Sequence, residues 1–524
     1  MIKNIKMLLL VSLTVVACSK KDDDVVINNT SDGLPLTAGS ADFSKYVAVG
    51  NSLSAGYSDG GLFIEGQKTS WTAILADQFK LVGGGEYKIP YMSDNVGGFA
   101  GVPPVPQLAS LKDTRFYLDR CGPERVADMP TTVFGASIAA TGKYNNVGIP
   151  GAKCIDVVKQ GYPNPYFGRI ATANTDSMLS YAKSQNPTFF SLWIGNNDVL
   201  SYALAGGDST LAQITPMAGI PGTGFEESYN EIINGMSSNG TVKGVVANIP
   251  YVTTIPNFTT ISVTPIEPFR IYKDANEDCA LTYDLSPTDI ATINDINMKL
   301  LGPLKQVLSA LGEPDRIQLL SLTSANPLLI KDENLDDKGP LITLAIQNTP
   351  ALAPFVPLAT YFGLAYGKAR HSKTGDLIPL ATRGAIGIDI PLSPGVPATL
   401  GKNGVTFPMA DRFILIPSEI LELKNATDTF NAHIKMKATE KGLAFVDANA
   451  ILTTVATTGI TANNFTVRST FATGGAFSLD GVHPSPRGYA LIANEFMKSI
   501  NAKYGSNLKA VDLGKYRILF ARSL

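Results

Sequence analysis

Four short apolar runs constrain the fold of this chain more than any other feature. They lie at residues 46–49, 188–194, 242–250 and 442–447, and glycine, proline or a polar residue ends each one. Runs of this length without strict alternation are typical of strands buried on both faces of a parallel sheet. Helical patterns fall between and after them, at residues 70–79, 175–184, 224–236, 427–441 and 489–501. The sequence therefore predicts an α/β fold, with a mostly parallel sheet in a three-layer α/β/α arrangement.

Two long segments interrupt this alternation. Residues 83–145 are rich in glycine and proline and predict a loop insertion with little regular structure. Residues 257–425 are harder to place, with a predicted helix at 288–311 and an apolar stretch at 341–367. Three prolines in that stretch argue against a membrane helix, and either a lid or ordinary core fits it. We expect one domain over residues 43–524, with insertions at about 83–145 and 257–425.

The N-terminus has the pattern of an export signal. Lys3 and Lys6 precede the apolar run 7–16, which is too short to span a bilayer. Val-Val-Ala-Cys, ending at Cys18, resembles a bacterial lipobox, although an ordinary signal peptide with an incidental cysteine also fits. We expect a signal peptide at residues 1–17, lipidation of Cys18 and a flexible tether over residues 18–42. The charged run at 19–24 resembles the export signal of surface-exposed lipoproteins in Bacteroidetes, and implies an outer-membrane location.

Charge and metal-ligand content narrow the functional classes. A formal net charge of −2 gives no basic surface for nucleic acid. The three histidines are far apart and no Cys-x-x-Cys occurs, so no structural zinc site is expected. Outside the cytoplasm one disulfide is possible among Cys121, Cys154 and Cys279, and we favour Cys121 with Cys154. The oligomeric state is not determined by the sequence.

Two distant segments carry residues suited to nucleophilic catalysis. Near the C-terminus, Asp480 precedes His483 by three positions in a Gly/Pro-rich turn, where a carboxylate can orient the imidazole as a general base. Near the N-terminus, Ser52 follows the first strand run and would face out at the carboxyl edge of the sheet. A serine needs such a base, and the anion formed on attack needs fixed donors.

Four motifs in order resemble the SGNH/GDSL hydrolase family. They are Gly50-Asn51-Ser52-Leu53, the segment from Asn146 to Ala152, Gly195-Asn196-Asn197-Asp198 and Asp480-Gly481-Val482-His483. The resemblance implies a flavodoxin-like core and no cofactor or metal. It makes Ser52 the nucleophile, His483 the base and Asp480 its partner, with an oxyanion hole formed by Ser52, Gly148 and Asn197. Asn51 departs from the family's aspartate, and the two insertions lie outside the resemblance.

Each site residue also has an ordinary explanation. Ser52 and Asp480 fit turns, His483 fits a loop, and Asp198 is expected to cap the helix after its strand. His371 and His433 are expected to have no catalytic role, and Asp447 is a second carboxylate at a strand end. Combined, the set favours a serine esterase acting on a lipid or an acylated glycan, anchored to a membrane by its N-terminal lipid. Acyl transfer to an alcohol, glycan O-deacetylation and a non-catalytic binding protein are the alternatives.

Overall fold

The computed structural model describes residues 35–267 and 285–524. A five-stranded sheet lies at the centre of its larger part, in the order β4-β1-β5-β6-β9, and every neighbouring pair is parallel. The strands are β1 (Tyr46–Gly50), β4 (Asn146–Gly148), β5 (Phe189–Trp193), β6 (Lys243–Ala247) and β9 (Ala444–Val446). The prediction of an α/β fold with a parallel sheet is confirmed.

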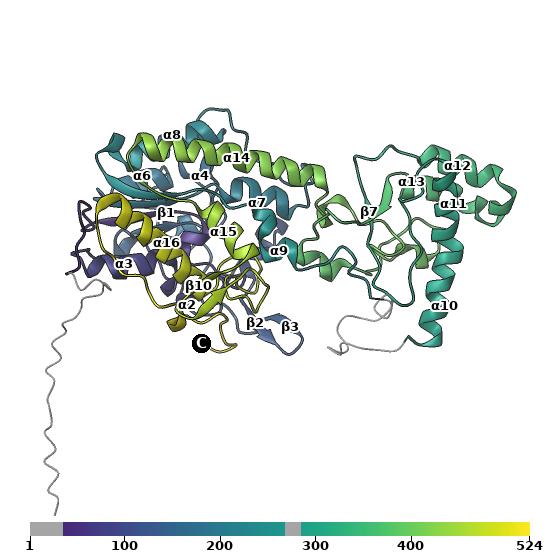
Figure 1. Cartoon of the computed structure of the whole chain (residues 1–524), viewed down its shortest axis with the longest axis horizontal. Coiled ribbons are helices and arrows are strands. Elements are labelled where there is room, and N and C mark those ends of the chain that lie inside the picture. The colour runs from purple at the N-terminus through teal and green to yellow at the C-terminus, as the bar shows by residue number, and fades with distance from the viewer. Residues whose placement is uncertain (1–34, 268–284) are drawn as a thin grey trace, which may run out of the picture.

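Helices cover both faces of this sheet (Figure 1). One face carries α4, α6, α8 and α14, which contact one another, and the other carries α3 and α16, which pack together. The helices of this main module are α1 (Ser52–Ala55), α2 (Ile64–Lys68), α3 (Trp71–Lys80), α4 (Cys154–Val157), α5 (Pro165–Gly168), α6 (Met178–Lys183), α7 (Asn196–Leu204), α8 (Phe225–Met236), α9 (Pro256–Thr259), α14 (Pro417–Glu440), α15 (Ala448–Thr457) and α16 (Pro486–Tyr504).

The helix boundaries follow local capping chemistry. Ser70 caps α3 as predicted, because its hydroxyl accepts from the backbone N–H of Ala73. Helix α14 begins ten residues before the predicted start at 427, with Pro417 in its first turn and Glu419 accepting from the Ile416 N–H. The sequence pattern did not predict α15. That helix follows β9 directly and is capped by Asp447.

The first insertion, residues 83–145, is mostly irregular as predicted. It also contains a hairpin of β2 (Phe116–Asp119) and β3 (Gly122–Arg125), which the sequence did not indicate. Arg115, almost fully buried, holds this region to the C-terminal end of the chain, because its guanidinium donates to the carbonyls of Ala521 and Arg522. A second hairpin, β10 (Ile460–Ala462) with β11 (Phe465–Val467), follows α15.

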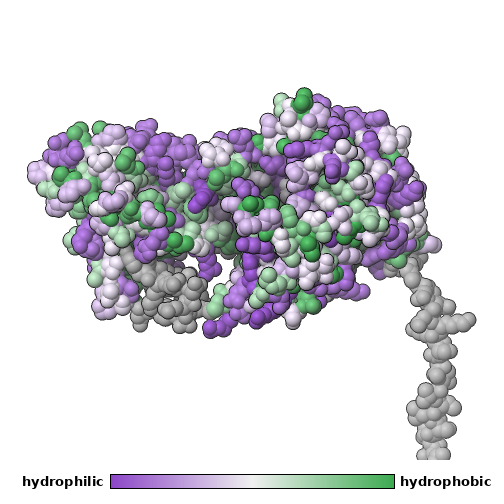
Figure 2. All heavy atoms as spheres, turned by 180° about the vertical axis from the view of Figure 1, so that it is seen from behind, coloured by the Kyte–Doolittle hydropathy of each residue, from purple (hydrophilic) through white to green (hydrophobic). Residues whose placement is uncertain are grey.

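A second module, residues 261–267 and 285–416, stands beside the main one (Figure 1), and Figure 2 shows both from behind. It has a hydrophobic core of its own, which runs from Ile266 to Ile416. The apolar stretch at 341–367 forms three consecutive helical segments that contribute to this core. The elements of the module include α10 (Pro287–Ile296), the π-helical η6 (Asn297–Leu301), α11 (Gly302–Ala310), β7 (Leu329–Lys331), α12 (Gly339–Asn348), η7 (Pro350–Leu358), α13 (Ala359–Tyr366) and β8 (Ala369–His371).

The chain enters and leaves the second module at one place. Ile261 forms an antiparallel bridge with Ile378, and the adjacent Leu377 forms one with Leu415. The outgoing and returning segments therefore flank a single short stretch. On the main-module side, α9 lies against the turn that carries His483, since the Asn257 N–H donates to the Gly481 carbonyl over 2.9 Å.

The structure describes only some of the residues on which the predictions for the N-terminus and the cysteines depend. Cys18 and residues 1–34 lie outside the described residues, as does Cys279. From Thr37 onward the chain is fixed to the C-terminal segment, through a bond from the Thr37 N–H to Asn507. Cys154 is a free, buried thiol, so the predicted pairing of Cys121 with Cys154 is wrong. Within the described ranges, no helix combines the length and the apolar character needed to cross a membrane.

Candidate active site

Ser52 lies where β1 turns into α1. Asn51 caps this short helix, accepting from the Leu53 N–H at 3.0 Å, and its own amide donates to Asn196 Oδ1 at 3.1 Å. Gly50 is required at the strand end, because a Cβ there would lie 2.2 Å from Ser54 Oγ and 2.6 Å from the Trp193 carbonyl oxygen. The strand end and its cap thus fix the Ser52 side chain, which is 8% exposed, at the carboxyl edge of the sheet.

His483 lies in a tight turn immediately before α16. Asp480 organises this turn, since its Oδ1 accepts the backbone N–H groups of Val482 and His483 at 2.9 and 2.8 Å. The turn closes with a bond from the Ser478 N–H to the His483 carbonyl. Gly60, from the main module's first loop, donates to Asp480 Oδ2 at 2.9 Å. The base and its carboxylate are therefore held by backbone contacts as well as by each other.

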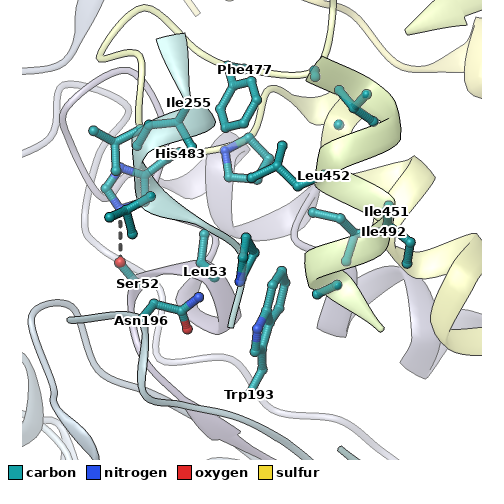
Figure 3. A pocket seen from close by; sticks show the side chains of 18 of the residues that line it. Ser52, Leu53, Trp193, Asn196, Ile255, Ile451, Leu452, Phe477, His483 and Ile492 are labelled. Atoms are coloured by element: carbon teal, nitrogen blue, oxygen red, sulfur yellow. Dashed lines mark hydrogen bonds between the residues drawn. The ribbon is translucent and has the colours of Figure 1, made fainter. Parts of the chain in front are cut away.

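The structure brings Ser52, His483 and Asp480 into one hydrogen-bonded chain. His483 Nδ1 lies 2.8 Å from Asp480 Oδ2, and His483 Nε2 lies 2.8 Å from Ser52 Oγ (Figure 3). A carboxylate only accepts, so Nδ1 carries the proton and Nε2 is left to accept from the serine hydroxyl. Burial alone would raise the pKa of Asp480, but the His483 charge and several hydrogen bonds outweigh it and lower this pKa to about 2. Asp480 is thus ionised at neutral pH.

Gly148 and Gly151 lie on the segment that is predicted to supply one of the oxyanion donors. The Gly148 N–H lies in β4 and donates to Asn146 Oδ1 at 2.8 Å, so its one hydrogen is engaged. Three residues later, Gly151 stands in a turn at φ +83°. Asn164 donates to the Pro150 carbonyl at 2.9 Å, and in a planar trans peptide the Gly151 N–H points the opposite way. Gly151 is exposed, and it is not among the residues that line the cavity beside Ser52.

Asn197 is the third predicted donor and it borders the same cavity as Ser52. Its amide nitrogen donates to the Ala152 carbonyl at 2.9 Å. Because the amide carries two hydrogens, one remains for another acceptor. Asp198, predicted to cap α7, does not do so: Gly195 stands at the cap position, and the buried Asp198 carboxylate accepts from the Cys154 N–H at 2.7 Å. The Asp198 contact ties α7 to α4 and so fixes the loop that contains Gly151.

An apolar cavity opens beside Ser52 and His483. The loop after β5 and the helices α15 and α16 surround it, and aromatic and branched aliphatic side chains form most of its wall (Figure 3). Trp193 closes one side, with its indole N–H donating to the Asn248 carbonyl. The polar groups that border the cavity include Asn196, Asn197 and His483. The nucleophile therefore stands at the edge of a hydrophobic space.

Other titratable groups lie outside this chain of contacts. His371 is buried in the second module, where burial lowers its pKa to about 4, and His433 on α14 bonds Asn230. Asp447 caps α15 and accepts from Asn248. Glu333, Asp411 and Glu419 bring carboxylate oxygens within 4.8 Å of one another. Burial raises the pKa of Asp411 to about 7 and that of Glu419 to about 8, so these groups hold protons near neutral pH.

No family model, curated protein or solved structure matches this chain. The case for a function therefore depends on the geometry of the site and on the chemistry of its residues.

Proposed function

We propose that this protein is a serine hydrolase that cleaves carboxylic esters through an acyl-enzyme on Ser52. The observation that carries the proposal is the continuous hydrogen-bond chain from Asp480 through His483 to Ser52. A serine, a histidine with its far nitrogen free to accept, and an ionised carboxylate on the near nitrogen are the parts that nucleophilic catalysis needs.

The first half of the reaction forms the acyl-enzyme. Ser52 Oγ attacks the ester carbonyl carbon while its proton passes to His483 Nε2, and Asp480 stabilises the imidazolium. The tetrahedral intermediate then collapses, the bond to the alcohol oxygen breaks, and His483 Nε2 gives its proton to that oxygen. In the second half, water loses a proton to His483, attacks the acyl carbon, and releases the carboxylic acid as Ser52 regains its proton.

The oxyanion formed in each half needs donors that are fixed in advance. The Ser52 N–H stands at the first position of α1, where no intrahelical partner is available to it. The second hydrogen of the Asn197 amide and the Gly148 N–H complete the set that we propose. The Gly148 N–H would then share its hydrogen between Asn146 Oδ1 and the oxyanion.

The order of motifs and the fold support membership of the SGNH/GDSL hydrolase family, which we propose for this chain. The parallel sheet has Ser52 after β1 and Asn197 after β5, and the His483 turn precedes the last long helix. We further propose that the protein is an exported lipoprotein held to a membrane through Cys18. Palmitate labelling of wild type and a Cys18→Ala variant in the native host tests this anchoring separately from catalysis.

Labelling with a fluorophosphonate probe tests the catalytic proposal. Wild type is expected to form a covalent adduct on Ser52, identified by peptide mass spectrometry, and to hydrolyse p-nitrophenyl acetate. Ser52→Ala is expected to lose both the adduct and the hydrolysis, whereas Ser54→Ala, altered two residues away, should keep the adduct. An unlabelled wild type, or full hydrolysis by Ser52→Ala, would overturn the proposal. Adding an acceptor alcohol and analysing the products distinguishes hydrolysis from acyl transfer.

A further inference from the structure

The cavity beside Ser52 is the feature that says most about the substrate. Its wall is built from Leu53 and Trp193 on one side, Ile451 and Leu452 of α15 on another, and Ile492 and Phe496 of α16. Figure 3 shows Leu452, Phe477 and Ile492 gathered around the space that leads away from Ser52 and His483. Glu495 is the one charged carboxylate among its lining residues in the described chain. A surface of this kind binds hydrocarbon and offers almost no partner to a sugar hydroxyl.

Building on the proposed function, we infer that this cavity holds the acyl chain of the ester, and that the substrates are esters of medium-chain fatty acids. The order of bond breaking favours the acyl half over the alcohol half. The alcohol must leave the site after the first step, whereas the acyl group stays bonded to Ser52 Oγ until water releases it. A pocket that starts at Ser52 and ends between two helices suits the group that stays.

The size of the cavity sets the chain length. The space open to the centres of water molecules is about 110 Å³. One water needs roughly 10–15 Å³ of such space and takes a share of about 30 Å³ in the liquid, and a methylene group is of similar size, so on the order of four to eight carbons fit. An acetyl group would leave most of the apolar wall without contacts. A chain of sixteen carbons would be too long for the cavity.

The expected rate profile follows from burial of methylene groups. Each buried methylene is worth about 0.8 kcal/mol, which corresponds to roughly a three- to fourfold gain in kcat/KM per carbon. We expect kcat/KM on p-nitrophenyl esters to rise by on the order of 10³-fold from acetyl to octanoyl, because six methylene groups are added, and to level off or fall beyond about ten carbons. Varying the alcohol of acetate esters over the same lengths should change kcat/KM much less.

Leu452→Trp tests the pocket, because the larger side chain fills the space in front of α16. This variant should lower the ratio of kcat/KM on the octanoyl ester to kcat/KM on the acetyl ester at least tenfold, whereas Leu452→Ala should shift the optimum to longer chains. Thr453→Trp, on the exposed outer side of the same helix, is the matched control and should keep the wild-type profile.

The outcomes separate the two proposals. A wild type that takes the fluorophosphonate and hydrolyses acetyl esters, but shows a flat chain-length profile that Leu452→Trp leaves unchanged, overturns the acyl pocket and keeps the hydrolase. A length dependence found only in the alcohol series also overturns it. Absence of both adduct and hydrolysis overturns the hydrolase itself. Acetyl hydrolysis by Leu452→Trp shows that this variant is folded. If Leu452→Trp does not fold, the shift of the chain-length optimum expected for Leu452→Ala tests the pocket instead.

Discussion

His483 Nε2 lies 2.8 Å from Ser52 Oγ, although 431 positions separate the two residues in the chain. The contact depends on two backbone turns, one after β1 and one before α16, and each is fixed by its own polar side chain. Asn51 caps the first turn, and Asp480 accepts two backbone N–H groups in the second. Disturbing either turn should therefore affect the rate of ester cleavage more than it affects the fold.

Asp480→Asn should lower kcat by roughly 10⁴-fold, because an amide nitrogen facing His483 Nδ1 favours the wrong tautomer. Steady-state kinetics on a p-nitrophenyl ester would measure the loss. Asp447→Asn is the control, since it changes another strand-end aspartate and keeps a good helix cap on α15. If the two variants had equal activity, Asp480 would not be the partner of the base.

Asn197→Ala should reduce kcat by roughly 10²–10³-fold while KM changes little, as expected for a donor that acts in the transition state. The amide also bonds the Ala152 carbonyl, so the variant releases one contact of the loop that carries Gly151. Slow but measurable hydrolysis separates this variant from Ser52→Ala. A rise in KM with kcat unchanged would assign Asn197 to ground-state binding instead.

Gly481→Ala should displace the turn that holds His483. The glycine has φ +69°, and a Cβ would lie 2.9 Å from the Asn257 backbone nitrogen. Gly505→Ala is the matched control, because Gly505 has a similar φ of +70°. A Cβ at Gly505 would have no atom of the described residues within 4 Å. Both variants should lose about 1–2 kcal/mol from the strained conformation. Only Gly481→Ala should also lose on the order of 10²-fold in kcat/KM, because a small misplacement of a catalytic group is costly.

Asp59→Asn should change how stability depends on pH. Asp59 is buried beside the Asp480 turn, where its Oδ1 accepts from the Leu479 N–H and its Oδ2 has no hydrogen-bond partner among the described residues. Burial raises the pKa of Asp59 to about 7. The folded protein therefore binds more protons than the unfolded chain between about pH 4 and pH 7, and its free energy of unfolding falls as the pH rises through this range.

An asparagine has no charge at any pH, so it avoids the free-energy cost of ionising a buried carboxyl. Its side-chain oxygen can still accept from the Leu479 N–H. The free energy of unfolding of Asp59→Asn, relative to wild type, should rise from pH 4 to pH 7 by on the order of 3 kcal/mol and then stay constant. Urea unfolding at pH 5 and pH 8 measures it. A difference that does not change with pH would mean that Asp59 titrates near its ordinary value.

The sequence was informative where local pattern and chemistry coincide. Each predicted strand of the main sheet forms, because a short run of β-branched and aromatic residues that ends in a turn strongly favours a buried strand. The Asp480–His483 pair and Ser52 also lie together, since both belong to turns at the same edge of the sheet. Each of these segments is specified by neighbours within a few positions of the chain, although the contact between Ser52 and His483 itself spans 431 positions.

The remaining parts depend on contacts that no local pattern records. Gly148 and Gly151 lie three residues apart in one motif, and only the bond to Asn146 Oδ1 shows that the first N–H is engaged. In the sequence, Leu452 and Ile492 look like ordinary core residues. The cavity that both of them line is apparent only from the structure. Cys154 looked like a disulfide partner, but it is a buried free thiol next to α8.

The way the second module joins the main one has a consequence for how the chain can be altered. Ile261 and Leu415 flank the same short stretch, Leu377–Ile378, so the two ends of the module are separated by about two strand spacings, roughly 10 Å. A turn of a few residues could span that gap. The second module is thus inserted into the main module at a single position. Replacing it with a short turn, or with another domain, would leave the order of the five-stranded sheet unchanged.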